Sequence, residues 1–250
     1  MKQWLRFNAV PTRESGPISR LLIALTAIPT GWYFWMTREM TEEPMVREST
    51  ARQKLIDAAL ALIRTKGYAA TSVDELCAHA GVTKGAFFHH FASKNALGVA
   101  AAEHWSQTTG ALFAAASYHT YRNPLDRVLG YLEFRKSLMR GAVPEFTCLV
   151  GTMVQEVYLT APDIRTACAA SISSHAATLE PDIAEAMKLY GVKGFTAESL
   201  ALHTQAVLQG AFILAKAKGG AEIAAASIDH LRRYIELLFQ PKVHKRKARS

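Results

Sequence analysis

The side chains best suited to bind a ligand lie in the stretch 71–91, which reads TSVDELCAHAGVTKGAFFHHF. Thr83 stands directly before Lys84 at a predicted helix start, where unpaired backbone N–H groups and a hydroxyl can hold an anion such as a phosphate. Lys84 adds a positive charge, and the next two residues, Gly85 and Ala86, carry almost no side chain. The combination favours binding to a polyanion that the helix can approach closely.

Two short helices must position these residues. Ser72 stands three residues before Glu75, the spacing at which two side chains satisfy N–H groups at a helix start. Gly81 can end this helix, because glycine adopts the left-handed conformation without steric cost. Thr83 then caps a second helix over 84–91. Two short helices joined by a tight turn form a helix-turn-helix when a third helix covers them.

The covering helix is predicted upstream, between Thr50 and Gly67. Thr50 and Gln53 have the spacing of another capping box. Downstream, Ser93 can cap a long helix over 94–118. The apolar stripe that would cover the two short helices consists of Leu55, Ile56, Ala59, Leu62 and Ile63.

From Thr50 to about Leu97 the chain resembles the DNA-binding domain of the tetracycline-repressor (TetR) family of bacterial regulators. The shared features fall in order along the sequence: an alanine-rich helix, a KGY…TSV junction, AGVTKG, and FHHF followed by SK. The remaining helical region fits the ligand-binding and dimerisation domain of that family in length and helix order. The resemblance therefore implies a bacterial DNA-binding regulator.

The resemblance also implies which residues contact double-stranded DNA. In this family the second helix of the motif enters the major groove with its N-terminal residues nearest the bases. The position of Phe88 most often holds a tyrosine whose hydroxyl reaches a phosphate, and phenylalanine lacks that hydroxyl. Phe87 and Phe91 are assigned to the core. The expected DNA contacts are Thr71, Ser72, Thr83, Lys84, Gly85, Ala86, Phe88, His89 and Lys94.

The predicted fold class is all-α, with an N-terminal three-helix helix-turn-helix domain and a C-terminal helical ligand-binding and dimerisation domain. The 250 residues allow one large domain or two modest ones. We expect an N-terminal extension at 1–44, the helix-turn-helix domain at 45–97, the ligand-binding and dimerisation domain at 98–240, and a basic tail at 241–250.

Residues 1–44 do not fit the family. Their apolar run, 21–36, is interrupted by Pro29 and Gly31, and at about 1.5 Å per residue it is too short for a hydrocarbon core of roughly 30 Å. We interpret the segment as an upstream reading of the start codon, since such proteins usually begin near Met45, or as a disordered extension. A membrane anchor and an ordered regulatory arm are the alternatives. The mass of the native N-terminal peptide tests the start-codon interpretation, which a chain beginning at Lys2 would exclude.

The C-terminal region is predicted to contain further helices. One begins at Asn123 and Pro124, a strongly apolar one covers 145–159, and 163–190 is helical with a bend or break at Pro181. The last two predicted helices, 196–218 and 221–239, are apolar over faces wider than one monomer needs. They predict a homodimeric four-helix bundle, with a monomeric core as the alternative.

The family binds small molecules between its middle helices, which implies an effector pocket there. The run CLVG…QE at 148–156 resembles a branch that includes regulators of electrophile-detoxifying reductases, where one cysteine senses electrophiles. Sensing requires an accessible Cys148 with a lowered pKa, and an inert core cysteine is the alternative. The candidate pocket residues are Trp105, Tyr131, Phe134, Arg135, Cys148, Met153, Glu156 and Tyr158.

Composition narrows the function further. The 29 Lys and Arg outnumber 21 Asp and Glu, and this net charge of +8 suits a polyanionic partner. Three scattered cysteines favour a reducing cytoplasm over a disulfide scaffold. His79, His89 and His90 with Cys77 match no common zinc spacing, so no metal and no other cofactor are expected.

We therefore expect a ligand-responsive dimeric transcriptional regulator. It would be a repressor that a small-molecule or electrophile effector releases from a palindromic operator. A membrane-tethered regulator using 21–36 is one alternative. An all-helical enzyme is another, but the sequence has no phosphate-binding glycine loop, no serine-centred elbow and no catalytic residue that we can assign.

Overall fold

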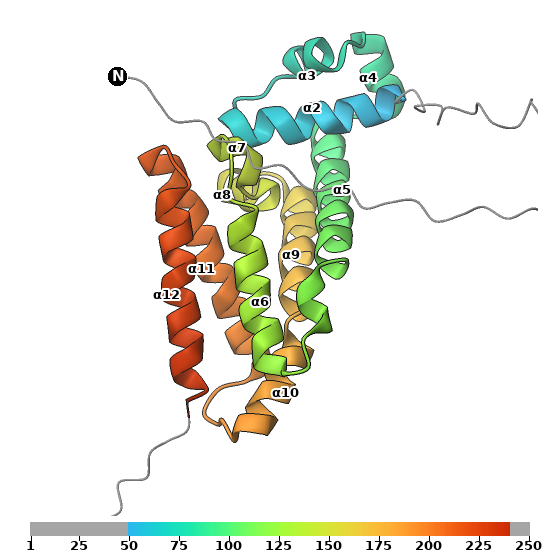
Figure 1. Ribbon diagram of the computed structural model, residues 1–250. Helices are drawn as coiled ribbons and strands as arrows, with labels where there is room; N and C mark the ends of the chain where they lie inside the picture. Colours follow the sequence, from blue (N-terminus) through green and yellow to red (C-terminus); the bar gives the residue numbers. More distant parts are fainter. Residues whose placement is uncertain (1–49, 241–250) are drawn as a thin grey trace, which may run out of the picture. The chain divides into compact units, whose positions relative to one another are not determined.

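The computed structural model describes residues 50–240. Over that range every regular element is helical, as predicted (Figure 1). The predictions for 1–44, including the apolar run 21–36, and for the tail at 241–250 lie outside the described residues. None of the helices between residues 50 and 240 combines the length and the apolar composition needed to cross a membrane.

Three helices form the N-terminal head, which we define as residues 50–97. Ser72 and Glu75 make the predicted capping box, and Gly81 ends the second helix with φ at 64°, in the left-handed region. Thr83 caps the third helix by accepting a hydrogen bond from the Ala86 N–H at 3.1 Å. The three helices are α2 (Ala51–Lys66), α3 (Val73–Ala80) and α4 (Lys84–His90).

The capping box predicted for α2 is only half present. The Thr50 hydroxyl accepts from the Gln53 N–H at 3.3 Å, but the Gln53 side chain donates to Asp57 at 2.9 Å. The Asp57 carboxylate lies one helical turn after Gln53 on the same face of α2, so the Gln53 side chain binds it instead of the Thr50 backbone N–H.

The rest of the described chain is a helical bundle. The predicted caps Ser93, Asn123 and Thr196 each accept a hydrogen bond from the first turn of the helix that follows. The elements are α5 (Lys94–Ala114), η1 (Ser117–Thr120), α6 (Pro124–Ser137), α7 (Val143–Phe146), α8 (Leu149–Val157), α9 (Pro162–Ala177), α10 (Glu180–Tyr190), α11 (Ala197–Lys218) and α12 (Glu222–Leu238).

The prediction of a single helix over 145–159 is wrong. The chain forms α7 and α8 instead, because Thr147 and Cys148 have extended backbone with ψ at 157° and 123°, and Cys148 becomes the N-cap of α8. The helix predicted over 163–190 divides between α9 and α10. Pro181 lies in the first turn of α10, where its missing N–H costs no hydrogen bond.

The head shares its hydrophobic core with the bundle. One cluster joins Leu55 and Phe87 of the head to Leu149 and Met153 of α8, and all four side chains are fully buried. A second cluster is formed mainly by α6, α10, α11 and α12. The core of the head therefore continues past residue 97 and includes one face of α8.

The last two helices lie side by side along one side of the bundle (Figure 1). They bury Leu208 and Ile228 among other residues, yet they also leave large apolar side chains at least 44% exposed. These exposed side chains are Leu202, Ile213 and Leu214 on α11, and Tyr234 and Leu237 on α12.

Gly98 and Gly110, both in α5, provide a matched test of this packing. A methyl group on Gly98 would lie 2.8 Å from Ile164 Cδ1 and 3.0 Å from Tyr68 Cε2, whereas one on Gly110 would meet nothing within 4 Å. We expect Gly98→Ala to lower the free energy of unfolding by about 1–2 kcal/mol, because overpacking outweighs the gain in helix propensity. Gly110→Ala should raise it by about 0.5–1 kcal/mol. Urea denaturation measures both, and equal effects would contradict close packing at Gly98.

Candidate functional site

The outer face of α4 is the first candidate site. Lys84, Gly85 and His89 are exposed, while Phe87 is fully buried and anchors the helix in the core. Phe88 is 56% exposed, with its ring edge-on to Phe87 at a centroid distance of 5.1 Å. The exposed face of α4 therefore carries the N-terminal end of the helix, the Lys84 ammonium and the Phe88 ring.

Lys84 has an ionic partner within the head. Its Nζ lies 2.7 Å from Asp74 Oδ1 on α3, and both side chains are well exposed. The hydrogen bond and charge of Asp74 raise the pKa of Lys84, so the lysine stays charged at neutral pH. Because solvent screens an exposed pair, the ammonium can exchange this carboxylate for a phosphate oxygen.

Two of the residues expected to contact DNA are directed into the head. Thr71 is 1% exposed, and its hydroxyl donates to the Gly67 carbonyl at 2.6 Å. The Lys94 ammonium donates to the carbonyl oxygens of Tyr68 and Thr71 at 2.9 and 2.8 Å, and burial lowers the pKa of Lys94. These side chains hold the loop before α3 in shape, and the exposed Ser72 lies at its end.

The second candidate site is an interior cavity bordered by α5, α6, α8, α9 and α11. Of the candidate pocket residues, Trp105, Arg135 and Cys148 line it. Its volume is about 30 Å³, room for about one water molecule. Ligand sites commonly measure roughly 300–1,000 Å³, so a larger molecule can enter only if the walls move.

Most of the polar side chains that line this cavity were not predicted from the sequence. Gln205 and Ser171 are buried, although each lies on a helix whose buried face is otherwise mainly apolar. A polar side chain on the buried face of a helix marks an interior hydrogen-bond network, and that signal was available in the sequence. The missed residues include Thr109, Ser171, His175, Gln205 and Gln209.

Tyr131 is the centre of that network. Its hydroxyl is fully enclosed, lies 3.0 Å from His175 Nε2, and accepts from Gln205 Nε2 at 3.1 Å. Arg135 Nη2 lies 2.9 Å from the same histidine nitrogen. Because a guanidinium can only donate, His175 Nε2 is the acceptor and the ring proton is on Nδ1. Burial, aided by the charge of Arg135, lowers the pKa of His175 to about 4.

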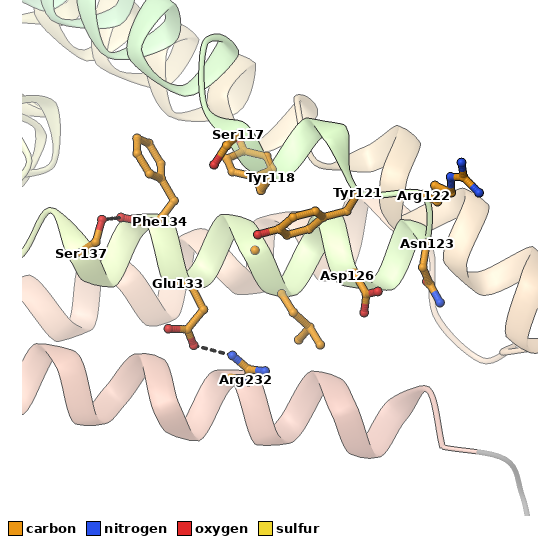
Figure 2. A pocket seen from close by; sticks show the side chains of 12 residues that line it. Ser117, Tyr118, Tyr121, Arg122, Asn123, Asp126, Glu133, Phe134, Ser137 and Arg232 are labelled. Atoms are coloured by element: carbon orange, nitrogen blue, oxygen red, sulfur yellow. Dashed lines mark hydrogen bonds and ion pairs between the residues drawn. The ribbon is translucent and has the colours of Figure 1, made fainter. Parts of the chain in front are cut away.

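Other candidate pocket residues lie away from the cavity. Met153 belongs to the core shared with the head, because Leu149 and Met153 are one helical turn apart on the face of α8 that packs into that core. Tyr158 is 51% exposed. Phe134 borders an open groove of about 700 Å³ on the surface of the bundle. Figure 2 shows Phe134 at this groove, near the ion pair between Glu133 of α6 and Arg232 of α12.

Glu156 links α8 to the head. Its Oε2 accepts from the Ala69 N–H at 2.7 Å, in the loop that leads to α3. Gly67 makes room for the carboxylate: a Cβ at that position would lie 2.5 Å from Glu156 Oε1. Glu156 also borders, with Cys148, an open hollow of about 230 Å³. The same short helix therefore contacts both a hollow and the loop that positions α3.

Cys148 has basic neighbours that are distant in the sequence. Its Sγ accepts from the Gly151 N–H at 3.4 Å at the start of α8. Lys216 borders the same open hollow as Cys148. Burial lowers the pKa of Arg64 and of Lys216, and a negative charge on Cys148 would oppose part of each shift. Local sequence could not reveal this environment, since α2 and α11 supply the two cations.

Two family profiles match the chain in succession. The profile described as "Bacterial regulatory proteins, tetR family" matches residues 55–101, and "Transcriptional regulator LmrA/YxaF-like, C-terminal domain" matches residues 124–224. The chain belongs to the TetR family. It is a DNA-binding transcriptional regulator, and the matches to TetR-family regulators indicate that it is not an enzyme.

Individual relatives agree with this assignment. Transcriptional regulator AcuR from Cereibacter sphaeroides is 33% identical over 119 residues, 48% of this chain and 54% of AcuR, so the alignment spans about half of that relative. The crystal structure of regulatory protein TetR from Rhodobacter sphaeroides has a TM-score of 0.66 and 26% identity, covering 74% of this chain and 99% of that one. The reduced form of NemR from E. coli shares the fold, with a TM-score of 0.64, 23% identity, and coverage of 73% and 95%.

Opposite changes to the Lys84–Asp74 pair test the role of α4 within this TetR head. We expect Lys84→Ala to weaken binding to all duplex DNA and to reduce the slope of log affinity against log salt by about one unit, because one phosphate contact is lost. Asp74→Asn should strengthen binding, because the lysine no longer has a competing carboxylate. Fluorescence anisotropy with labelled duplexes between about 50 and 200 mM salt measures both.

Lys188→Ala is the matched control, since Lys188 is an exposed lysine on α10, outside the head. It should leave the salt dependence unchanged. An unaltered slope in Lys84→Ala would remove Lys84 from the phosphate contacts.

Proposed function

We propose that this protein is a ligand-responsive repressor that binds a palindromic operator as a homodimer and leaves it when a small molecule binds. One observation carries the proposal: in a TetR-family chain, α8 contacts both a polar interior cavity and the loop that positions the helix-turn-helix. The proposed DNA contacts are the exposed Ser72, Thr83, Lys84, Gly85, Phe88 and His89, with Ala86 half-buried beside them.

Dimerisation is supported by the apolar surface of α11 and α12. Leu202, Ile213 and Leu214 on α11 and Tyr234 and Leu237 on α12 are all at least 44% exposed. A second copy would bury these side chains in a four-helix bundle related by a two-fold axis. Such a dimer presents two copies of α4, so its operator would be an inverted repeat with half-sites spaced by whole helical turns.

Release from DNA can follow from the position of α8. Cys148, the N-cap residue of α8, borders the cavity, and Glu156 in the last turn of the helix accepts a hydrogen bond from the Ala69 N–H. A ligand that widens the cavity displaces the start of α8, and a rigid helix of nine residues transmits that displacement to the loop before α3. The effector acts only through its greater affinity for the displaced state.

Ile213→Glu tests the dimer. We expect this variant to be monomeric at micromolar concentration and to lose operator binding, because a carboxylate at the centre of the bundle would be desolvated without a partner. Leu189→Glu on α10, where the leucine is 62% exposed, should change neither property. Light scattering after gel filtration and gel shifts with DNA from upstream of the protein's own gene measure both. A wild-type protein that is strictly monomeric and does not bind this DNA would contradict the proposed function.

Cys148 makes an electrophile a specific candidate effector. We expect N-ethylmaleimide to release the wild-type protein from its operator but to leave Cys148→Ser bound, because alkylation adds bulk at the start of α8. Cys168→Ala should respond like wild type, since Cys168 is fully buried and burial raises its pKa to about 12. If Cys148→Ser is still released by N-ethylmaleimide, Cys148 is not the sensor.

A further inference from the structure

The guanidinium of Arg135 is a half-buried cation without a carboxylate partner. Between residues 50 and 240 no ion pair includes it, and its buried Nε has no hydrogen-bond partner there. A buried charge is costly unless a counter-ion or a full set of hydrogen bonds compensates it. Aromatic rings compensate part of the cost: Cζ lies 4.3 Å from the centroid of Phe113 and 5.8 Å from that of Tyr131.

The hydrogen bonds that Arg135 does make go to neutral groups. Nη2 donates to His175 Nε2 at 2.9 Å and lies 3.4 Å from the Tyr131 hydroxyl. His175 is uncharged at neutral pH, because burial lowers its pKa. Gln205 fixes the Tyr131 hydroxyl from the other side. The network therefore orients the guanidinium without neutralising it.

The interior cavity lies next to this cation. Arg135, His175 and Gln205 all line it, and Trp105 and Phe212 give it apolar walls. Arg135 is the one lining residue, among those described, whose side chain is positively charged at neutral pH. A positive, hydrogen-bonding end next to apolar walls is complementary to a small molecule that carries one negative charge on a hydrocarbon body.

We propose that Arg135 binds the carboxylate of a small organic acid, and that this acid is the effector. The inference rests on the proposed repressor function and names its ligand class. A planar carboxylate can take two parallel N–H···O bonds from a guanidinium, one of them from the unpartnered Nε. A single negative charge matches the single cation, whereas a phosphate monoester would bring a second charge without a second cation. The present volume of about 30 Å³ favours an acid with few carbon atoms.

Isothermal titration calorimetry of the full-length chain tests this with matched probes. The probes are the straight-chain acids from acetate to hexanoate, each paired with its primary amide, which has nearly the same shape and no charge. We expect at least one acid to bind, and its amide to bind on the order of 10- to 100-fold more weakly, because the charge-assisted hydrogen bonds are lost.

Arg135→Met keeps an apolar stem against Phe113 and removes the charge. It should lose acid binding by a similar factor while unfolding at the same or a higher temperature, since it removes a half-buried cation whose Nε has no hydrogen-bond partner between residues 50 and 240. Arg140→Met, which removes an exposed arginine just beyond α6, is the matched control and should bind as wild type. If Arg135→Met does not fold, Arg135→Lys should bind the acid more weakly than wild type and still prefer it to the amide.

The outcomes separate the two levels of the proposal. Equal binding of acid and amide, undiminished binding by Arg135→Met, or no binding of any acid at millimolar concentration overturns the carboxylate assignment. Gel shifts on the same samples show whether the repressor function stands. A protein that binds DNA from upstream of its gene but no acid refutes the ligand class alone. A protein that binds an acid but not this DNA refutes the repressor function and leaves the Arg135 site intact.

Discussion

The arrangement of this molecule depends on the burial of one face of α8 against the N-terminal head. Leu149 and Met153 lie in the same hydrophobic cluster as Leu55 and Phe87, so the helix-turn-helix cannot complete its core without the bundle. Removing that face of α8 would expose the side of α2 that the two short helices do not cover. Since short helices gain their stability from packing rather than propensity, the geometry of α3 and α4 is tied to the position of α8.

The opposite side of α8 is polar and partly exposed. Cys148 and Gln155 border the open hollow, and Glu156 reaches across to the backbone of Ala69. One nine-residue helix thus has a rigid hydrophobic face and a face of exchangeable polar contacts. Glu156 joins this side of α8 to the head through the Ala69 N–H, so a displacement of the helix would act on the loop before α3 through that contact.

The sequence predicted the head more completely than the bundle, for a physical reason. Capping residues such as Ser72, Thr83 and Ser93 act on N–H groups three residues away, so their effect can be read locally. The break at Thr147 and Cys148 is set by tertiary packing, and an apolar run does not reveal it. The same limit applies to the cavity: Arg135, His175 and Gln205 come from three helices, and only the fold shows that they meet. Arg135 and its partner Tyr131 were predicted as pocket residues from the sequence, while His175 and Gln205 were not.

The small volume of the interior cavity affects the effector concentration that is needed for binding. Suppose that only a small fraction of the protein molecules has, at any moment, a cavity wide enough to admit an effector. The measured dissociation constant of the effector then equals its intrinsic dissociation constant divided by that fraction. If the protein acts as the proposed repressor, the energy needed to widen the cavity that Trp105 and Phe212 help to line sets the effector concentration that releases it from DNA. Tight closure would then give a high threshold concentration, and a smaller side chain in place of either ring would lower it.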